Sequence, residues 1–299
     1  MGRFDGKSII VTGSSSGIGQ AALIAFAKEG ASVVVHGTNS ERIEKTRQLL
    51  KEASISEDRI LVVQGEIQKE ETLQNLVSKT LEKFGKIDVL INNAGIGSGK
   101  GETESTIENF DEVMAVNLRA PFRLIELSLP HLKKTKGNII NVSSVAAFMT
   151  PMNNPIMTVY CASKAALDRM AQMNNPMMTV YCASKAALDR MTQVQALQFA
   201  PFGIRINNIN PGPVATNIMA RNSTKFETSE NSPVSNDDMF TKFVTKVTPM
   251  GRSADPKELN EVFLLLADSV TGSFITGACW VVDGGMSIYS PTIEDIVAR

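Results

Sequence analysis

Short apolar runs alternate with longer amphipathic runs along the chain, and this alternation predicts a parallel α/β sheet. Runs rich in aliphatic and β-branched residues predict strands, whereas apolar residues three or four apart predict helices. The expected strands are 7–12, 31–36, 60–63, 87–91, 137–142, 204–209 and 277–283, and the expected helices are 20–29, 40–52, 70–84, 107–132 and 257–267. Because such alternation forms parallel sheets covered on both faces, we predict one doubly wound α/β domain of about seven strands over residues 1–299.

A glycine-rich turn follows the first expected strand and leads directly into a helical run. Backbone N–H groups and the positive end of a helix dipole attract phosphate at such a position. Glycines let the backbone turn tightly and approach the pyrophosphate of a dinucleotide. The residues expected to contact the cofactor here are Gly13, Ser15, Ser16, Gly17, Ile18 and Gly19.

The spacing Thr-Gly-x-x-x-Gly-x-Gly, with Asn92-Asn93-Ala94-Gly95 after the fourth expected strand, resembles the short-chain dehydrogenase/reductase family. The resemblance extends from about residue 7 to about residue 287 and implies a Rossmann-like fold with hydride transfer between a nicotinamide and a carbonyl or alcohol. It also implies that Asn93, Ala94 and Gly95 lie along the cofactor, and that Glu66 and Ile67 lie near the adenine. The family usually has Asp where Glu66 stands.

The end of the second expected strand bears on the choice of cofactor. An acid at Gly37 or Thr38 would accept a hydrogen bond from the ribose 2′-hydroxyl of NAD, and neither residue is an acid. The Arg that many NADP-dependent relatives carry is also missing, because Thr38 occupies its place. Thr38, Asn39, Ser40 and Arg42 could together hold a 2′-phosphate, so NADP(H) is favoured and NAD(H) remains possible.

The run Tyr-Cys-Ala-Ser-Lys occurs twice, at 160–164 and at 181–185. Tyr and Lys four residues apart on a helix share one face, and a neighbouring ammonium lowers the pKa of a phenol. Such a pair predicts a proton donor and acceptor that works near neutral pH. By the resemblance, Ser144 at the end of the fifth strand binds the substrate oxygen, and Asn117 bends the long helix and holds a relay water.

The two runs belong to a tandem duplication of residues 152–172 and 173–193, which differ at only two pairs of positions. These pairs are Ile156 against Met177 and Ala171 against Thr192. The repeat indicates either a recent duplication or an error of sequence assembly. Spacing from Ser144 favours the first copy as the catalytic one, whereas spacing to the later Pro-Gly turn favours the second.

Helix physics favours the second copy as the catalytic one. Pro176 suits the first turn of a helix, and an apolar stripe then continues through Val180, Ala183, Ala187, Met191, Val194 and Leu197. A helix that began in the first copy would meet Pro176 in its interior, at a cost of about 3 kcal/mol or more. We therefore predict Tyr181 and Lys185 as the catalytic pair, with Lys185 also holding the cofactor, and keep Tyr160 and Lys164 as the alternative.

The turn after the sixth expected strand is implied by the resemblance to hold the nicotinamide carboxamide, through Pro211, Gly212, Val214 and Thr216. The stretch 217–250 is polar, rich in Ser, Thr and Asn, and without a clear period. Such a stretch beside a site predicts a mobile substrate lid.

Composition and charge narrow the class of protein. The chain is 43% hydrophobic and 20% charged, with a formal net charge of −1, so it offers no basic surface for nucleic acid or acidic membranes. No apolar run is long enough to span a bilayer. Two of the cysteines, Cys161 and Cys182, occupy equivalent positions in the two copies of the duplicated segment. This argues against a disulfide framework and favours a location in the cytoplasm. No metal site is predicted, and the resemblance implies a homodimer or homotetramer.

These observations favour an oxidoreductase with a small-molecule carbonyl or alcohol substrate. A second hypothesis is a cofactor-binding protein with little or no turnover, because the duplication could displace the catalytic tyrosine. A third is a scaffold role for the duplicated helix, which predicts a partner that is lost when residues 152–172 are deleted.

Overall fold

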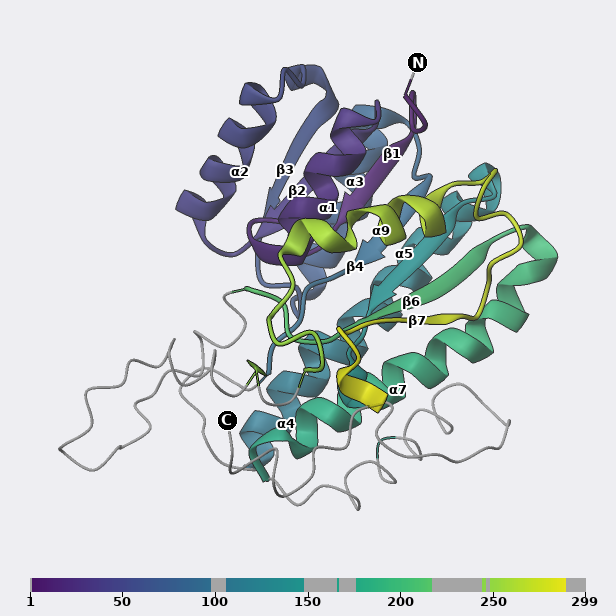
Figure 1. Cartoon of the computed structure of the whole chain (residues 1–299). Helices are drawn as coiled ribbons and strands as arrows, with labels where there is room; N and C mark the ends of the chain where they lie inside the picture. Colours follow the sequence, from purple (N-terminus) through teal and green to yellow (C-terminus); the bar gives the residue numbers. More distant parts are fainter. Residues whose placement is uncertain are drawn as a thin grey trace.

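The computed structural model describes residues 2–97, 106–147, 166, 176–216, 244–245 and 248–288. Its seven strands form one parallel sheet in the order β3-β2-β1-β4-β5-β6-β7 (Figure 1). The strands are β1 (Ser8–Val11), β2 (Ser32–Gly37), β3 (Ile60–Gln64), β4 (Val89–Asn92), β5 (Asn138–Val142), β6 (Arg205–Pro211) and β7 (Cys279–Val282). The predicted doubly wound α/β fold is confirmed.

Helices connect consecutive strands. They are α1 (Gly17–Lys28), α2 (Ser40–Glu52), α3 (Glu70–Phe84), α4 (Ile107–Met114), α5 (Ala120–Thr135), α7 (Pro176–Phe199) and α9 (Asn260–Ala267), with 3₁₀ turns at η1 (Glu57–Arg59), η3 (Val145–Ala147), η4 (Ala200–Phe202), η6 (Pro256–Leu259) and η7 (Met286–Ile288). The bounds predicted for α2 and α3 are confirmed. Helix α1 begins at Gly17 rather than at Gln20, because the end of the glycine turn already forms the first helical turn.

Two apolar cores lie on opposite faces of the sheet, because successive strand residues point to opposite sides. Helices α1, α2 and α9 cover one face, and α3, α4, α5 and α7 cover the other (Figure 1). Ile9 and Val33 pack into the first core, whereas Ile10 and Val34 pack into the second. Each such fully buried side chain stabilises the fold by about 1.5–3 kcal/mol.

The prediction of one regular helix over 107–132 is wrong. This stretch divides into α4, a π-helical segment η2 (Ala115–Arg119) and α5, with Pro121 in the first turn of α5. A π-helical turn marks a local rearrangement of the backbone hydrogen bonds, and such turns are frequent at functional sites. The segment contains Asn117.

Helix α7 begins at Pro176, as the sequence predicts, but its apolar stripe is not the predicted one throughout. Val180 and Met191 are buried, whereas Leu197 is 77% exposed. After Met191 the predicted stripe continues to Val194 and then to Leu197, in two steps of three residues. Because each residue of an α-helix turns about 100°, each step falls about 60° short of a full turn, so Leu197 lies about 120° around the helix from Met191. Thr192 and Phe199 lie on the buried face there instead.

The carboxyl ends of β1, β4, β5 and β6 lie along one edge of the sheet. The order of the chain reverses between β1 and β4, since β2 lies beside β1 and β5 beside β4. Ligands of open α/β sheets bind at such a reversal, outside the carboxyl ends of the strands. Among the described residues, no helix has both the length and the hydrophobicity needed to cross a membrane.

Candidate active site

The predicted phenol, hydroxyl and amine meet at the carboxyl edge of the sheet. Ser144 lies just beyond the end of β5, and its side chain is hydrogen-bonded to that of Tyr181 near the start of α7. Lys185 follows one turn along the same helix, with its Nζ atom 5.7 Å from the centre of the Tyr181 ring. The three side chains therefore form one cluster, as their order in the sequence predicts.

Lys185 is held inside the protein and not at its surface. The residue is 3% exposed, and its Nζ donates a hydrogen bond to the backbone oxygen of Val142 at 2.8 Å. Burial lowers the pKa of Lys185 to about 8, against the opposing effect of the Asp189 charge. The ammonium is therefore charged at neutral pH and loses its proton as the pH rises through about 8.

The predicted lowering of the tyrosine pKa by this ammonium is wrong. Burial raises the pKa of Tyr181 above its usual value, and the hydrogen bond from Ser144 opposes this only in part. The Lys185 Nζ donates to the carbonyl of Val142, and its charge does not outweigh the loss of hydration of the phenol. The phenol accordingly keeps its proton at neutral pH.

Asn117 uses its side chain to join three segments of the chain. Its Oδ1 accepts from the backbone N–H of Ile96 at 2.9 Å, and its Nδ2 donates to the backbone oxygen of Ile96 at 2.9 Å and to Ser184 Oγ at 3.0 Å. The residue is 1% exposed and lies in the π-helical segment. Both amide hydrogens therefore bind protein, which ties the residues after β4 to α7.

The glycine turn and the residues after β4 are packed against each other closely enough to require glycine. A Cβ atom on Gly13, whose φ is +66°, would lie 2.9 Å from the Cα of Ala94, and one on Gly19 would lie 2.3 Å from Asn93 Nδ2. Asn93 Nδ2 also donates to the backbone oxygen of Gly13 at 3.2 Å. Helix α1 begins here, and its N-cap, Ser16, makes no capping hydrogen bond with its side chain. This glycine-lined start of a helix fits the pyrophosphate of a dinucleotide.

His36 near the end of β2 is a site residue that the sequence reasoning missed. Its Nδ1 accepts from the backbone N–H of Gly13 at 3.0 Å, and its own backbone N–H donates to Ser14 Oγ at 2.9 Å. Burial lowers the pKa of His36 to about 4, so the ring is neutral and can accept. A polar residue inside an otherwise apolar strand was the available signal, and it marks a residue that fixes the glycine turn.

The residues predicted to determine whether the chain prefers NADP or NAD lie just beyond the carboxyl ends of β2 and β3, at the rim of the sheet. Thr38 and Arg42 are exposed, whereas Asn39 Oδ1 caps α2 by accepting from the backbone N–H of Arg42 at 2.8 Å. Glu66 is exposed, and the Ile67 side chain is buried in the core. The capping bond engages Asn39 Oδ1, whereas Ser40 and Glu41 at the same rim are exposed together with Thr38 and Arg42.

The turn after β6 approaches the glycine turn. A Cβ atom on Gly17 would lie 3.1 Å from Thr216 Cγ2, and Val214 is buried. Pro211 ends β6, and a Cβ on Gly212 would lie 2.7 Å from the Cα of Asp283. The two turns that are expected to hold opposite parts of a dinucleotide therefore meet at Gly17 and Thr216.

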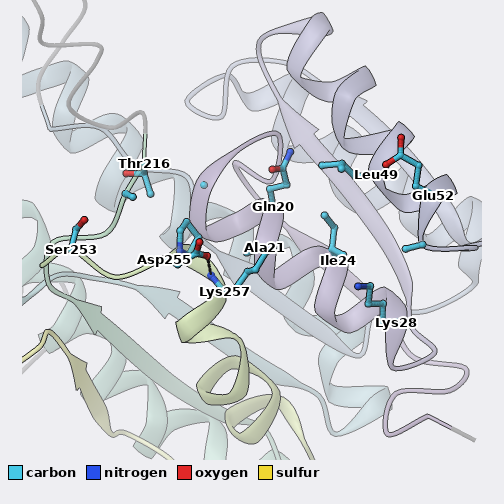
Figure 2. Close-up of a pocket in the computed structure, with 14 residues that line it drawn as sticks. Gln20, Ala21, Ile24, Lys28, Leu49, Glu52, Thr216, Ser253, Asp255 and Lys257 are labelled. Carbon is cyan, nitrogen blue, oxygen red and sulfur yellow. Dashed lines mark hydrogen bonds between the residues drawn. The ribbon is translucent and has the colours of Figure 1, made fainter. Parts of the chain in front are cut away.

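A cleft of about 910 Å³ opens on the outer side of this meeting point, between α1, α2 and the segment that leads into α9. Figure 2 shows Gln20, Leu49, Thr216 and Lys257 around it. Neither Tyr181 nor the other members of its cluster line this cleft, so it adjoins the predicted cofactor turn without containing the acid/base residues.

A network of buried polar side chains beneath α7 was also missed. Asp189 accepts from Asn208 Nδ2 at 2.6 Å and from Asn210 Nδ2 at 2.9 Å. Thr192 Oγ1 donates to Asn208 Oδ1 at 2.7 Å and accepts from Asn141 Nδ2 at 2.8 Å. The sequence signal was a run of asparagines inside two buried strands, opposite a helix with polar residues on its buried face.

Several predicted features lie outside the described residues. These are the alternative pair Tyr160 and Lys164, nearly all of the first copy, and most of the expected lid, 217–250. No group of three or more His, Cys, Asp or Glu side chains in the described part of the chain is arranged to hold a metal ion.

Comparison with known proteins identifies the class to which this fold and cluster belong. Residues 7–174 match the family model described as short chain dehydrogenase, and residues 169–287 match the one described as enoyl-(acyl carrier protein) reductase. The two matches meet inside the duplicated segment, so the first copy falls in one and the second copy in the other. The chain belongs to the short-chain dehydrogenase/reductase family, whose members are nicotinamide-dependent oxidoreductases.

Individual relatives match over almost their full length. The 3-oxoacyl-(acyl-carrier-protein) reductase FabG of Thermotoga maritima is 31% identical over 287 residues, which cover 96% of this chain and 100% of that protein. Glucose 1-dehydrogenase 2 of Bacillus subtilis is 31% identical over 293 residues, or 97% and 98% of the two chains. A short-chain dehydrogenase/reductase of unknown function from Caenorhabditis elegans, solved with cofactor, is 33% identical with a TM-score of 0.80, covering 96% and 97%.

Proposed function

We propose that this chain transfers a hydride between NADP(H) and a small-molecule carbonyl or alcohol, with Tyr181 as the acid and base. The observation that carries the proposal is the hydrogen bond between Tyr181 and Ser144 beside the buried Lys185. A phenol and a hydroxyl that already share a hydrogen bond can both reach the oxygen of one substrate carbonyl. The cluster also lies on the same sheet edge as the glycine turn.

The roles of the side chains follow from their chemistry. A bound nicotinamide would supply the hydride in reduction and accept it in oxidation. In reduction, the Tyr181 hydroxyl donates its proton to the substrate oxygen, and the Lys185 ammonium stabilises the phenolate that remains. The Ser144 hydroxyl donates to the same oxygen and fixes its position. Asn117 supports the site through Ile96 and Ser184.

The direction of the pKa shifts favours reduction at neutral pH. The raised pKa of Tyr181 keeps the phenol protonated, which is the form that reduction uses. Oxidation needs the phenolate, so its rate is expected to rise with pH. Reduction is expected to decline above about pH 8, where Lys185 loses the charge that stabilises the phenolate.

The rim beyond β2 supports a preference for NADP(H). A Cβ atom on Gly37 would lie 2.4 Å from Ser15 Oγ, so the position leaves no room for the acid that binds the ribose of NAD. Thr38 and Arg42 are exposed at the same rim and can hydrogen-bond a 2′-phosphate. The ratio of kcat/KM with NADPH and with NADH measures this preference directly.

One difference between the two copies supports Tyr181 over Tyr160. Thr192 is fully buried and bridges Asn141 on β5 and Asn208 on β6 through its hydroxyl. The first copy has Ala171 at this position, and alanine can make neither bond. Leaving those two amides without a partner would cost about 1–3 kcal/mol each.

We also propose a cellular compartment, an oligomeric state and a substrate class for the chain. The two cysteines in the described part of the chain, Cys182 and Cys279, are reduced thiols, which suits a reducing compartment such as the cytoplasm. The family resemblance favours a homodimer or homotetramer. The names of the relatives favour a small carbonyl or alcohol as substrate, such as a ketone or a sugar.

The test is a pair of matched substitutions, Tyr181→Phe and Tyr160→Phe, assayed for NADPH oxidation over a panel of carbonyl substrates. Tyr181→Phe is expected to lower kcat by at least about a hundredfold, because general acid catalysis contributes about 10²–10⁴-fold. Tyr160→Phe is expected to leave kcat near the wild-type value. NADPH fluorescence titration checks that both variants still bind the cofactor. Loss of activity in Tyr160→Phe alone would move the site to the first copy, and binding without turnover in the wild type would contradict the proposed reaction.

A further inference from the structure

A buried carboxylate lies on the same helix as the acid/base pair. Tyr181, Lys185 and Asp189 are spaced four residues apart along α7 and so lie on one face of it, one turn from each other. Asp189 is 7% exposed. A carboxylate in such a position needs hydrogen-bond donors and a nearby cation to compensate for its lost hydration.

The donors come from the ends of two strands. Asn208 Nδ2 donates to Asp189 Oδ1 at 2.6 Å, and Asn210 Nδ2 donates to both carboxylate oxygens, at 3.1 and 2.9 Å. The Ser143 hydroxyl, which donates to the backbone oxygen of Lys185 at 3.1 Å, also lies beside the carboxylate. The Asp189 side chain on α7 is thus in contact with polar groups from β6 and from the end of β5.

The same contacts lead to the residue that faces the catalytic phenol. Asn210 Nδ2 donates not only to Asp189 but also to the backbone oxygen of Ser144, at 3.1 Å. Asp189 therefore fixes Asn210, and Asn210 fixes the backbone of Ser144. Because Tyr181 is carried by the helix that carries Asp189, this bridge sets the position of Ser144 relative to Tyr181.

The charges around the carboxylate are few. Lys185 on α7 and Cys279 on β7 are the titratable groups that interact with it electrostatically in the described part of the chain. Burial raises the pKa of Cys279 to about 12, with the charge of Asp189 as a second cause, so the thiol is neutral. Lys185 is then the cation that balances Asp189, and burial of the pair raises the pKa of the acid and lowers that of the amine.

We propose that Asp189 is a positioning residue of the active site, which holds Ser144 opposite Tyr181 through Asn210 and keeps Lys185 charged by supplying its counter-charge. This inference rests on the proposed function. It assigns two separable effects to one side chain: a geometric effect, carried by Asn210, and an electrostatic effect, carried by the charge itself. A residue that only stabilised the fold would produce neither effect on the reaction.

Three single variants separate these effects. Asp189→Asn removes the charge and disturbs the bridge. Asn210→Ala removes the bridge to Ser144 but keeps the charge. Thr192→Val is the control, because it removes a buried hydroxyl from the same network one turn further along α7 without changing any charge or the Ser144 contact. Each is assayed as the full chain for carbonyl reduction with NADPH from about pH 6 to about pH 10, where bell-shaped profiles report the essential groups.

Asp189→Asn is expected to lower kcat by about ten- to a hundredfold, as misplacement of a reacting group does. Its alkaline limb is expected to move to lower pH, because without the nearby negative charge Lys185 gives up its proton more easily. Asn210→Ala is expected to lower kcat and to move the limb less than Asp189→Asn does, because the acid stays in place and loses one donor that stabilises its charged form. Thr192→Val is expected to lower the melting temperature with the limb unmoved. NADPH fluorescence titration of each variant shows whether cofactor binding is retained.

An unmoved alkaline limb in Asp189→Asn would overturn the electrostatic half of the inference, and a wild-type kcat in Asn210→Ala would overturn the geometric half. If Asp189→Asn does not fold, Asn210→Ala alone still decides the geometric half. A wild-type protein that binds NADPH and turns over no carbonyl contradicts the proposed function instead. Turnover that depends on Tyr181 but not on Asp189 or Asn210 contradicts only this inference.

Discussion

The two halves of the sheet are built from different kinds of residue. Strands β1 and β2 bury mainly aliphatic side chains, together with Ser8 and His36, whereas β5 and β6 bury asparagines at 138, 141, 207, 208 and 210. The first half holds the glycine turn, whose backbone packs closely against the residues after β4. The second half carries Ser144 and faces α7. Under the proposed function, the cofactor is held mainly by backbone groups of the glycine turn, whereas the proton donor is oriented by side-chain hydrogen bonds.

Three of the buried asparagines, Asn92, Asn141 and Asn208, are connected with Thr192 in one chain of hydrogen bonds. Asn92 Nδ2 donates to Asn141 Oδ1 at 2.8 Å, Asn141 Nδ2 to Thr192 Oγ1 at 2.8 Å, and Thr192 Oγ1 to Asn208 Oδ1 at 2.7 Å. The chain ends on Asp189. A satisfied buried network of this kind fixes a unique arrangement, and each deletion leaves a partner exposed to an apolar surrounding. Rotation of α7 is therefore coupled to two strands.

The largest expected effect comes from breaking the middle of that chain. Asn141→Ala leaves Asn92 Nδ2 without its acceptor and removes one of the two hydrogen bonds of Thr192 Oγ1, so the free energy of unfolding is expected to fall by about 2–5 kcal/mol. The kcat for carbonyl reduction is expected to fall as well, because α7 loses its tie to β5. Urea denaturation and steady-state kinetics measure the two quantities.

Ile139→Val on the same strand is the control for Asn141→Ala, with an expected loss of about 0.5–1.5 kcal/mol and an unchanged kcat. Equal losses of stability in the two variants, with equal kcat, would contradict the view that the polar network orients the helix.

An intermediate effect is expected from the cofactor half. The Cβ introduced by Gly19→Ala would lie 2.3 Å from Asn93 Nδ2 and 2.7 Å from the backbone oxygen of Gly13, so the glycine turn must shift. The Kd for NADPH is expected to rise at least about tenfold, equivalent to about 1.4 kcal/mol. Fluorescence titration measures it.

Gly85→Ala is the control for Gly19→Ala, because the φ of +75° at Gly85 strains an alanine there but no atom lies within 4 Å of the added Cβ. It is expected to lower stability by about 1 kcal/mol and to leave NADPH affinity unchanged. Unchanged affinity in Gly19→Ala would place the cofactor away from this turn.

The smallest effect on stability is expected from a substitution at Leu197, near the carboxyl end of α7. Leu197 is exposed although the apolar stripe predicts it inside, so Leu197→Lys is expected to change the free energy of unfolding by less than about 0.5 kcal/mol. Thermal unfolding and kcat measured together check this. A loss of several degrees in melting temperature that depends on protein concentration would show that Leu197 is covered by a second copy of the chain.

Much of the fold could be predicted because the relevant signals are local. The bounds of α2 follow from an Asn39 cap and an amphipathic run, and those of α3 from its apolar period and from Gly85. The order of glycine turn, Asn117, Ser144 and Tyr181 also indicated the cluster that the structure assembles. Local chemistry and chain order were enough for these features.

The remaining features depend on contacts between distant segments, which no local pattern encodes. The π-helical turn at Asn117 accompanies bonds to Ile96 and Ser184, and the burial of Asp189 depends on asparagines of another strand. The direction of the Tyr181 pKa shift was predicted wrongly because a pairwise rule ignores desolvation, which is the larger influence here.

The spacing of Tyr181, Lys185 and Asp189 on a single helix has a consequence for how such a chain can diverge. The acid, the cation and the counter-charge all belong to helix α7, so a small displacement of this helix moves all three together and preserves the distances between them. Segments that shape the substrate cavity can then change in sequence without retuning the proton chemistry. A new substrate specificity can therefore arise through substitutions in the segments around α7, while the residues on the face of α7 that carries Tyr181, Lys185 and Asp189 stay unchanged.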